Sequence, residues 1–193
     1  TFITVTSVLA ILIFCSMFAW YITRVNTKVT KALYLLCAFS MVVPFQMVMF
    51  TLSSMADTLN LDTPWVLWII YLGFGAGLAV FMFCGFMRSV PLEIEEAAMI
   101  DGLSRAGIFF RIFTRISTAP MVIIGMSVFM SYYNSFLWPV MTITDNTALY
   151  QIMQLIRTLN SRYTGRYGVV LAATMMSLIV PFALYCFFQK YIV

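Results

Sequence analysis

Five long apolar stretches that contain no charged residue constrain the fold of this chain more than any other feature. They are residues 2–22, 32–52, 65–87, 121–143 and 169–188. A helix crosses the bilayer core with about 20 residues at ~1.5 Å each. Continuous apolar stretches favour helices over barrel strands, in which polar and apolar residues alternate. The sequence therefore predicts an all-α, polytopic membrane protein with five transmembrane helices in a single domain, residues 1–193.

The composition agrees with a membrane environment. Hydrophobic residues make up 63% of the chain and charged residues only 9%, whereas a typical soluble domain is about 25% charged. A water-soluble fold could not bury this much apolar surface, so part of the solvent is expected to be lipid. Because the chain begins at Thr1, close to an apolar stretch, we expect it to be a crop of a longer protein.

The basic residues predict the orientation in the membrane. If five helices alternate in direction, one side receives eight basic residues: Arg24, Lys28, Lys31, Arg88, Arg105, Arg111, Arg115 and Lys190. The other side receives Arg157, Arg162 and Arg166. Cytoplasmic loops carry the excess of Lys and Arg. The N-terminus is therefore expected outside and the C-terminus in the cytoplasm, with a cytoplasmic loop over residues 88–120 and an outer loop over 144–168.

The sequence lacks the residues that metal binding, proton-driven transport, acid–base catalysis and nucleotide binding usually require. The chain has no histidine, and its four cysteines lie in apolar stretches without metal-ligand spacing, so no metal site is expected. The apolar stretches carry no charged residue, which argues against a proton-driven carrier and an acid–base membrane enzyme. No phosphate-binding loop of the GxxxxGK[ST] type occurs. We expect no cofactor here, and a nucleotide would have to bind to a separate chain.

Three of the seven acidic residues fall within four positions of the cytoplasmic loop. A helix over residues 92–101 would place Glu93, Glu96 and Ala97 on one face, and Glu95 with Ala98 on another. The acids suit the positive end of a helix dipole, and Gly102 can end the helix in the left-handed conformation. Such a short helix could enter a groove on another protein. An interfacial helix with solvated acids is the alternative.

The segment "EEAAMIDGLSRAGIFFRI" resembles the EAA loop of the permease subunits of ABC importers. Glu96, Ala97, Ala98, Gly102 and Ile112 match that motif. The longer run "RSVPLEIEEAAMIDGLS" and the run "YYNSFLWPV" are similar to the carbohydrate branch, the maltose-type permeases. Tyr133 stands where that branch usually has Trp, and Thr114-Arg115 stands where the family has Leu-Pro.

The resemblance implies the type I ABC importer permease fold and a non-catalytic subunit that forms half of a sugar translocation path. It implies that the loop is a coupling helix that docks on a cytoplasmic ATPase dimer, which binds the ATP. The residues expected to couple are Glu93, Glu96, Ala97, Ala98, Asp101, Gly102 and Ile112. The other implied partners are a second permease subunit and an extracytoplasmic solute-binding protein. The implied location is a bacterial or archaeal cell membrane.

Other residues are candidates for contact with sugar or with the binding protein. A sugar path needs hydrogen-bonding groups and aromatic faces, which Gln46, Tyr133, Asn134 and Trp138 could supply, unless they only join helices or lie at the interface. In the outer loop, contact with the binding protein is expected from Arg157, Arg162, Tyr163 and Arg166, or this is an ordinary polar loop. A peptide, phosphate or amino-acid cargo remains an alternative. A free-standing carrier or channel would predict intramembrane charges or an inverted repeat.

Overall fold

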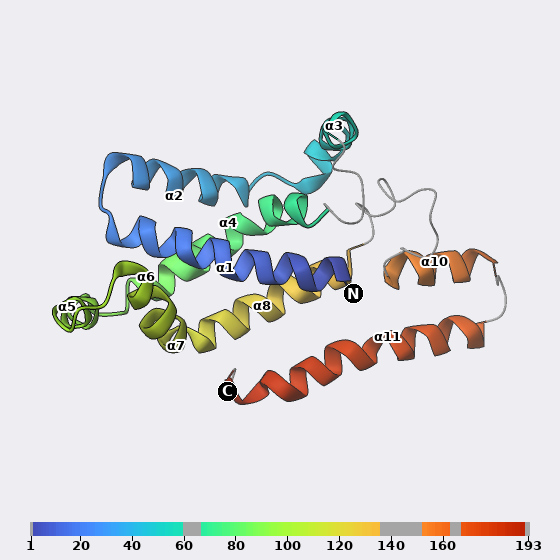
Figure 1. Ribbon diagram of the computed structural model, residues 1–193. Coiled ribbons are helices and arrows are strands. Elements are labelled where there is room, and N and C mark those ends of the chain that lie inside the picture. The colour runs from blue at the N-terminus through green and yellow to red at the C-terminus, as the bar shows by residue number, and fades with distance from the viewer. Residues whose placement is uncertain (1, 60–66, 136–151, 163–166, 192–193) are drawn as a thin grey trace.

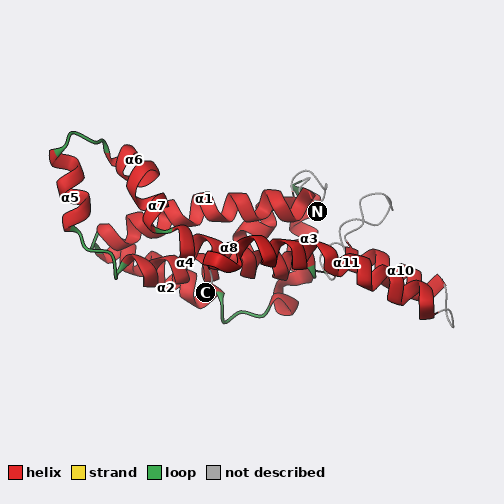
Figure 2. Ribbon diagram, turned by 90° about the horizontal axis from the view of Figure 1, so that it is seen from below, coloured by secondary structure: helices red, strands yellow, loops and turns green. Residues whose placement is uncertain are grey.

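The computed structural model of the protein describes residues 2–59, 67–135, 152–162 and 167–191 (Figure 1). Within these ranges every regular element is a helix, as Figure 2 shows, which confirms the predicted all-α class. Among the described residues, three helices are long and apolar enough to span a membrane: α1 (Phe2–Arg24), α4 (Leu67–Met87) and α11 (Tyr167–Phe188). A fourth span results if α8 (Thr118–Tyr133) and the helical segment before it count as one bent element.

The second apolar stretch, residues 32–52, differs from the prediction of one spanning helix. It is divided between α2 (Lys28–Ser40) and α3 (Phe45–Thr58). Pro44 lies at the break with φ −65° and ψ 137°, an extended conformation. Proline donates no backbone hydrogen bond and disfavours a helical conformation of the residue before it, so a helix cannot run on through this position. In Figure 1 α3 is seen along its axis while α2 lies across the view.

Two further segments are described only in part. The fourth apolar stretch begins as α8, with Pro120 in the first helical turn, where a missing N–H leaves no bond unmade. The described helix ends at Tyr133. The rest of the predicted stretch from residue 136 on lies outside the described part of the chain, as do all of residues 136–151. The predicted outer loop, residues 144–168, contains the helix α10 (Ile152–Arg162).

The core lies where α1 packs along α4 and α8. Its fully buried side chains include Ile11, Leu67, Phe83 and Ile124. Two buried hydroxyls of α1 are satisfied locally, since Ser7 Oγ donates to Ile3 O at 2.7 Å and Ser16 Oγ donates to Leu12 O at 2.5 Å. Such bonds to the preceding turn let a polar side chain lie in an apolar interior.

Candidate functional site

The loop that the sequence singles out forms a helix across one end of the bundle. It is α5 (Glu93–Ile100), and Figure 2 shows it lying crosswise beyond the ends of the spanning helices. Three short elements follow: α6 (Arg105–Ile108), the π-helical turn η1 (Phe109–Phe113) and α7 (Thr114–Ile116). The C-terminal end of α11 lies toward the same end of the bundle as α5 (Figure 1). The predicted helix at residues 92–101 is confirmed.

The spacing between Ala98 and Gly102 has a structural cause. Leu103 N donates to Ala98 O, and Gly102 N donates to Met99 O, each at 3.0 Å. These two bonds form a Schellman motif, which requires a left-handed residue directly after the helix cap. Gly102 occupies that position with φ 83°. The glycine therefore ends α5 four residues after Ala98, as predicted from its left-handed preference.

One side of α5 faces away from the bundle, and we call it the outer face. It consists of Glu93, Glu96, Ala97 and Ile100, which recur at helical spacing and are all exposed. The Ile100 side chain is 86% exposed although it is large and apolar. The predicted site did not include Ile100, although its position seven residues after Glu93 was a sufficient signal. The outer face thus combines two carboxylates, a small residue and an apolar tip.

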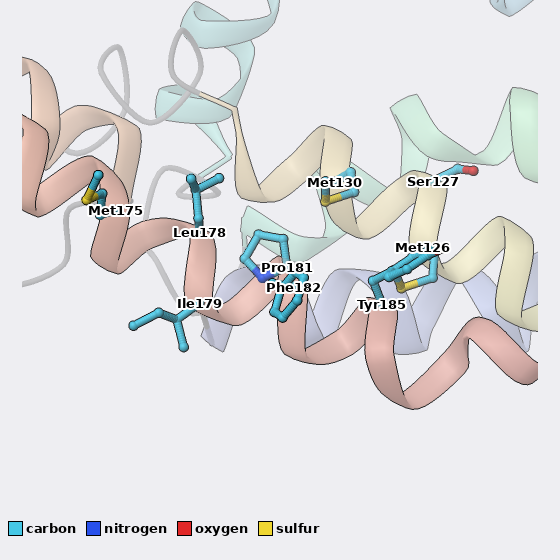
Figure 3. Close-up of a pocket in the computed structure, with 9 residues that line it drawn as sticks. All are labelled: Met126, Ser127, Met130, Met175, Leu178, Ile179, Pro181, Phe182 and Tyr185. Atoms are coloured by element: carbon cyan, nitrogen blue, oxygen red, sulfur yellow. The ribbon is translucent and has the colours of Figure 1, made fainter.

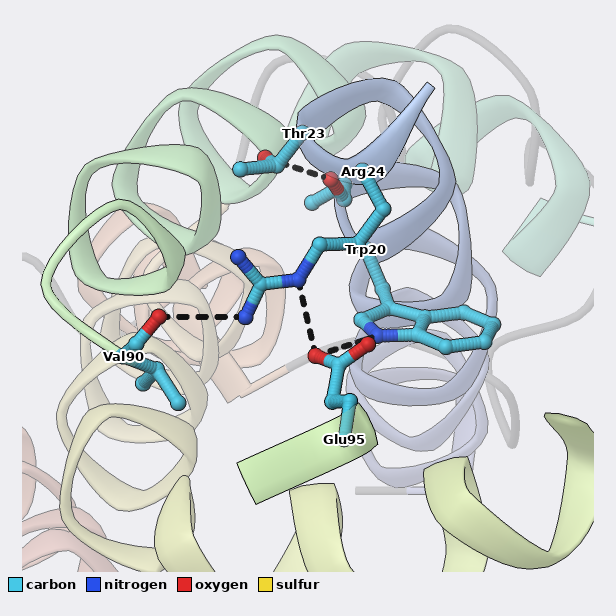
Figure 4. Close-up of polar contacts among 6 residues, drawn as sticks. Trp20, Thr23, Arg24, Val90 and Glu95 are labelled. Atoms are coloured by element: carbon cyan, nitrogen blue, oxygen red, sulfur yellow. Dashed lines mark hydrogen bonds and ion pairs between the residues drawn. The ribbon is translucent and has the colours of Figure 1, made fainter. Parts of the chain in front are cut away.

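The opposite side of α5 is fixed to the end of α1 (Figure 4). The Glu95 carboxylate forms an ion pair with Arg24, whose Nε donates to Glu95 Oε1 at 2.7 Å. Trp20 Nε1 donates to the same oxygen at 3.1 Å. Arg24 Nη2 also donates to the carbonyl of Val90, just before α5, at 3.2 Å. The sequence predicted that Glu95 and Ala98 share a separate face, but it did not predict these partners. Ala98, expected among the ATPase-coupling residues, is buried on this inner side.

The remaining predicted coupling residues lie near α5 with different exposure. Asp101 is exposed at the C-cap of α5, whereas Ile112 is half-buried in η1. The helical segment Arg105–Ile116 then bends by 77° into Thr118–Tyr133. The bend falls just before Pro120, which cannot donate a hydrogen bond to the turn before it. This bend returns the chain from the end of the bundle into the fourth apolar stretch.

The described path residues lie on α3 and at the end of α8. Gln46 is exposed in the first turn of α3, and Asn134 is exposed at the C-cap of α8. Tyr133 is buried, and its Oη donates to Ser177 O of α11 at 2.8 Å. That contact matches the alternative role of joining helices. Trp138 lies outside the described residues.

The outer-loop candidates are described only in part. Arg157 is exposed on α10, and Arg162 is the last residue of that helix, with a side chain outside the description. Tyr163 and Arg166 lie outside the described residues. The predicted contact with a binding protein therefore stays a prediction.

A pocket of about 710 Å³ lies between α8 and α11 (Figure 3). Its lining comprises Met126, Ser127, Met130, Met175, Leu178, Ile179, Pro181, Phe182 and Tyr185. The lining is apolar apart from Ser127 and Tyr185, and Ser127 Oγ already donates to Ile123 O at 2.9 Å. A site for a sugar needs several convergent polar groups. This pocket is therefore an apolar surface between two helices and does not have the character of a sugar site.

The described residues form a helical bundle with membrane-spanning candidates and an acid-rich helix across one end, as the resemblance to ABC importer permeases implies. Residues 4–192 match the family described as binding-protein-dependent transport system inner membrane component. The chain belongs to this family, and the resemblance of its loop to that of ABC importer permeases is confirmed at the level of the family. It is a multi-pass membrane protein whose relatives are named as permease proteins and not as enzymes.

Curated relatives cover nearly the whole chain. The probable starch degradation products transport system permease protein AmyC of Thermoanaerobacterium thermosulfurigenes is 30% identical over 97% of this chain and 68% of its own length. The arabinooligosaccharides transport system permease protein AraQ of Halalkalibacterium halodurans is 27% identical over 99% of this chain and 68% of its own. The multiple sugar-binding transport system permease protein MsmG of Streptococcus mutans is 28% identical over 100% of this chain and 71% of its own.

Proposed function

We propose that this chain is the permease subunit of an ATP-driven sugar importer. In this proposal it forms half of the translocation path beside a second permease subunit. A cytoplasmic ATPase dimer supplies the energy, and an extracytoplasmic solute-binding protein delivers the sugar. The N-terminus then lies outside and the C-terminus in the cytoplasm, in agreement with the eight basic residues assigned to the side of α5.

The observation that carries the proposal is the outer face of α5. Ile100 is 86% exposed next to the two carboxylates, so this face offers one partner both an apolar contact and negative charge. Glu93 and Glu96 flank the small Ala97 on the same exposed side, so a neighbouring chain can approach closely and present a basic side chain. A groove on the ATPase that takes Ile100 and pairs with Glu96 fits this surface. Movement of the ATPase would then move α5 as a rigid element.

The decisive test is Glu96→Lys in membranes that contain both permeases, the ATPase and the binding protein. Loss of one partner of an interfacial ion pair costs about 2–5 kcal/mol when the other charge stays buried. We therefore expect the amount of ATPase that co-purifies with the permease, and sugar uptake, each to fall at least about tenfold. Both are measured per unit of permease in the membrane.

Asp57→Lys is the matched control, because it makes the same reversal of charge at an exposed acid on α3. This variant should retain ATPase and uptake. If Glu96→Lys also retains both, α5 is not the docking element and the proposal for its outer face fails.

The sugar cargo is supported by the names of the relatives, which refer to starch degradation products, arabinooligosaccharides and multiple sugars. Uptake of labelled oligosaccharides by the complete transporter, with unlabelled peptides, phosphate and amino acids as competitors, tests it. Competition by sugars alone supports the proposal. Competition by one of the other solutes would favour the alternative cargo.

A further inference from the structure

We infer that Glu95 is a positioning residue that ties α5 to α1 through Arg24 and Trp20, and that it takes no part in docking the ATPase. The inference rests on the proposed function, because it concerns how movement of α5 reaches the transmembrane helices. It divides the acidic cluster in two. Glu93 and Glu96 contact the partner chain, whereas Glu95 makes its contacts within the permease.

The first observation is that one guanidinium joins three segments. Arg24 lies in the last turn of α1, where a cation also suits the helix dipole. It pairs with Glu95 of α5 at 2.7 Å and donates to the Val90 carbonyl, between α4 and α5, at 3.2 Å. Figure 4 shows the Arg24 side chain extended between these two acceptors. A displacement of α5 therefore pulls on α1 through directional bonds.

The second observation is that Trp20 contacts both α5 and the segment that follows it. Its indole N–H donates to Glu95, which lies within α5. The centroid of its ring lies 5.8 Å from the centroid of the Phe109 ring, which follows α5 in the chain. Phe109 belongs to a buried cluster with Met87 and Phe113, against which Trp20 packs. Both α5 and η1 therefore contact Trp20 near the end of α1.

The environment makes these contacts strong enough to matter. The side chains of Arg24 and Glu95 are only 17% and 10% exposed, so water and salt screen their attraction less than at an open surface. A helix as short as α5 is unstable without tertiary contacts. Because α1 packs along α4 and α8, a force that reaches the end of α1 is passed to the bundle.

The test is a double-mutant cycle of Arg24→Gln and Glu95→Gln in the complete transporter. Three quantities are measured: ATPase co-purified with the permease, ATP hydrolysis stimulated by the binding protein, and sugar taken up per ATP hydrolysed. Lys28→Gln and Asp57→Asn are matched controls, because they neutralise exposed charges on α2 and α3. Glu95→Gln keeps the shape and the acceptor oxygen of the side chain, so this variant carries the test if Arg24→Gln does not assemble.

Each single variant should retain its ATPase within about twofold and lose on the order of tenfold in sugar per ATP, since a charged hydrogen-bond network is broken. The double variant should take up as much sugar per ATP as the single variant with the lower value, because both changes remove the same contact. The controls should match the unsubstituted transporter. Independent effects would instead multiply to about a hundredfold loss, which overturns the pairing.

Two other results would overturn the inference. Loss of ATPase co-purification in Glu95→Gln, as expected for Glu96→Lys, would place Glu95 in the docking face. Lower stability with unchanged sugar per ATP in the assembled complexes would make the contact merely structural. Failure of the proposed docking is recognised separately, because Glu96→Lys would then retain its ATPase whatever Glu95→Gln does.

Discussion

At the scale of a single residue, Gly102 sets the length of α5. Its φ of 83° is left-handed, and the space around an added Cβ is open. A substitution there is therefore resisted by backbone conformation and not by crowding. An L-residue with a side chain pays about 1–2 kcal/mol for this conformation. The glycine matters because it permits the two bonds that close α5.

Gly102→Ala is expected to loosen the end of α5. A cost of 1–2 kcal/mol corresponds to about a 5- to 30-fold change in the local equilibrium, so the amides of Gly102 and Leu103 should exchange hydrogen faster by that factor. Gly107→Ala is the matched control in the same loop, since its new Cβ would meet Ser104 Oγ at an ordinary 3.4 Å. Equal exchange rates in the two variants would contradict this role of Gly102.

At the scale of elements, the spacing of the helices depends on positions without a side chain. A Cβ on Gly77 of α4 would lie 2.9 Å from the Cys37 carbonyl of α2 and would also meet Ser40 Oγ. A backbone oxygen cannot move aside by rotating a bond as a side chain does. The absence of a side chain at Gly77 therefore determines how closely α2 approaches α4.

Gly77→Ala should lower the unfolding midpoint of the detergent-solubilised transporter, because overpacking costs about 1–3 kcal/mol. Gly85→Ala in the same helix meets nothing within 4 Å and improves helix propensity by up to about 1 kcal/mol. Its midpoint should stay the same or rise. Thermal unfolding of the two purified variants measures the difference, and a midpoint that falls equally in both would contradict the packing argument.

At the scale of the whole molecule, α5 and the C-terminal end of α11 lie toward one end of the bundle (Figure 1). The distribution of basic residues predicts that this end faces the cytoplasm. Green fluorescent protein fused after residue 193 should therefore fluoresce, while alkaline phosphatase fused there should be inactive. The reverse pair of results would put α5 outside the cell and contradict the proposed docking to an ATPase.

The sequence alone determined the helical class, the position of α5 and its stop at Gly102. These depend on interactions along the chain: apolar length, acids at a helix start and a left-handed residue at a helix end. The sequence also contains Pro44, but the continuous apolar stretch around it indicated a single spanning helix and not the break found between α2 and α3. Ile100 could have been found from helical spacing alone.

Only the tertiary structure decided which glutamate turns inward. Glu95 and Glu96 are neighbours of the same type, and helical geometry separates their faces without saying which face meets the bundle. That choice depends on Arg24, 71 residues earlier, and on Trp20, 75 residues earlier. Contacts at such separation arise only when α1 and the loop are packed together, so no local pattern of residues could reveal them.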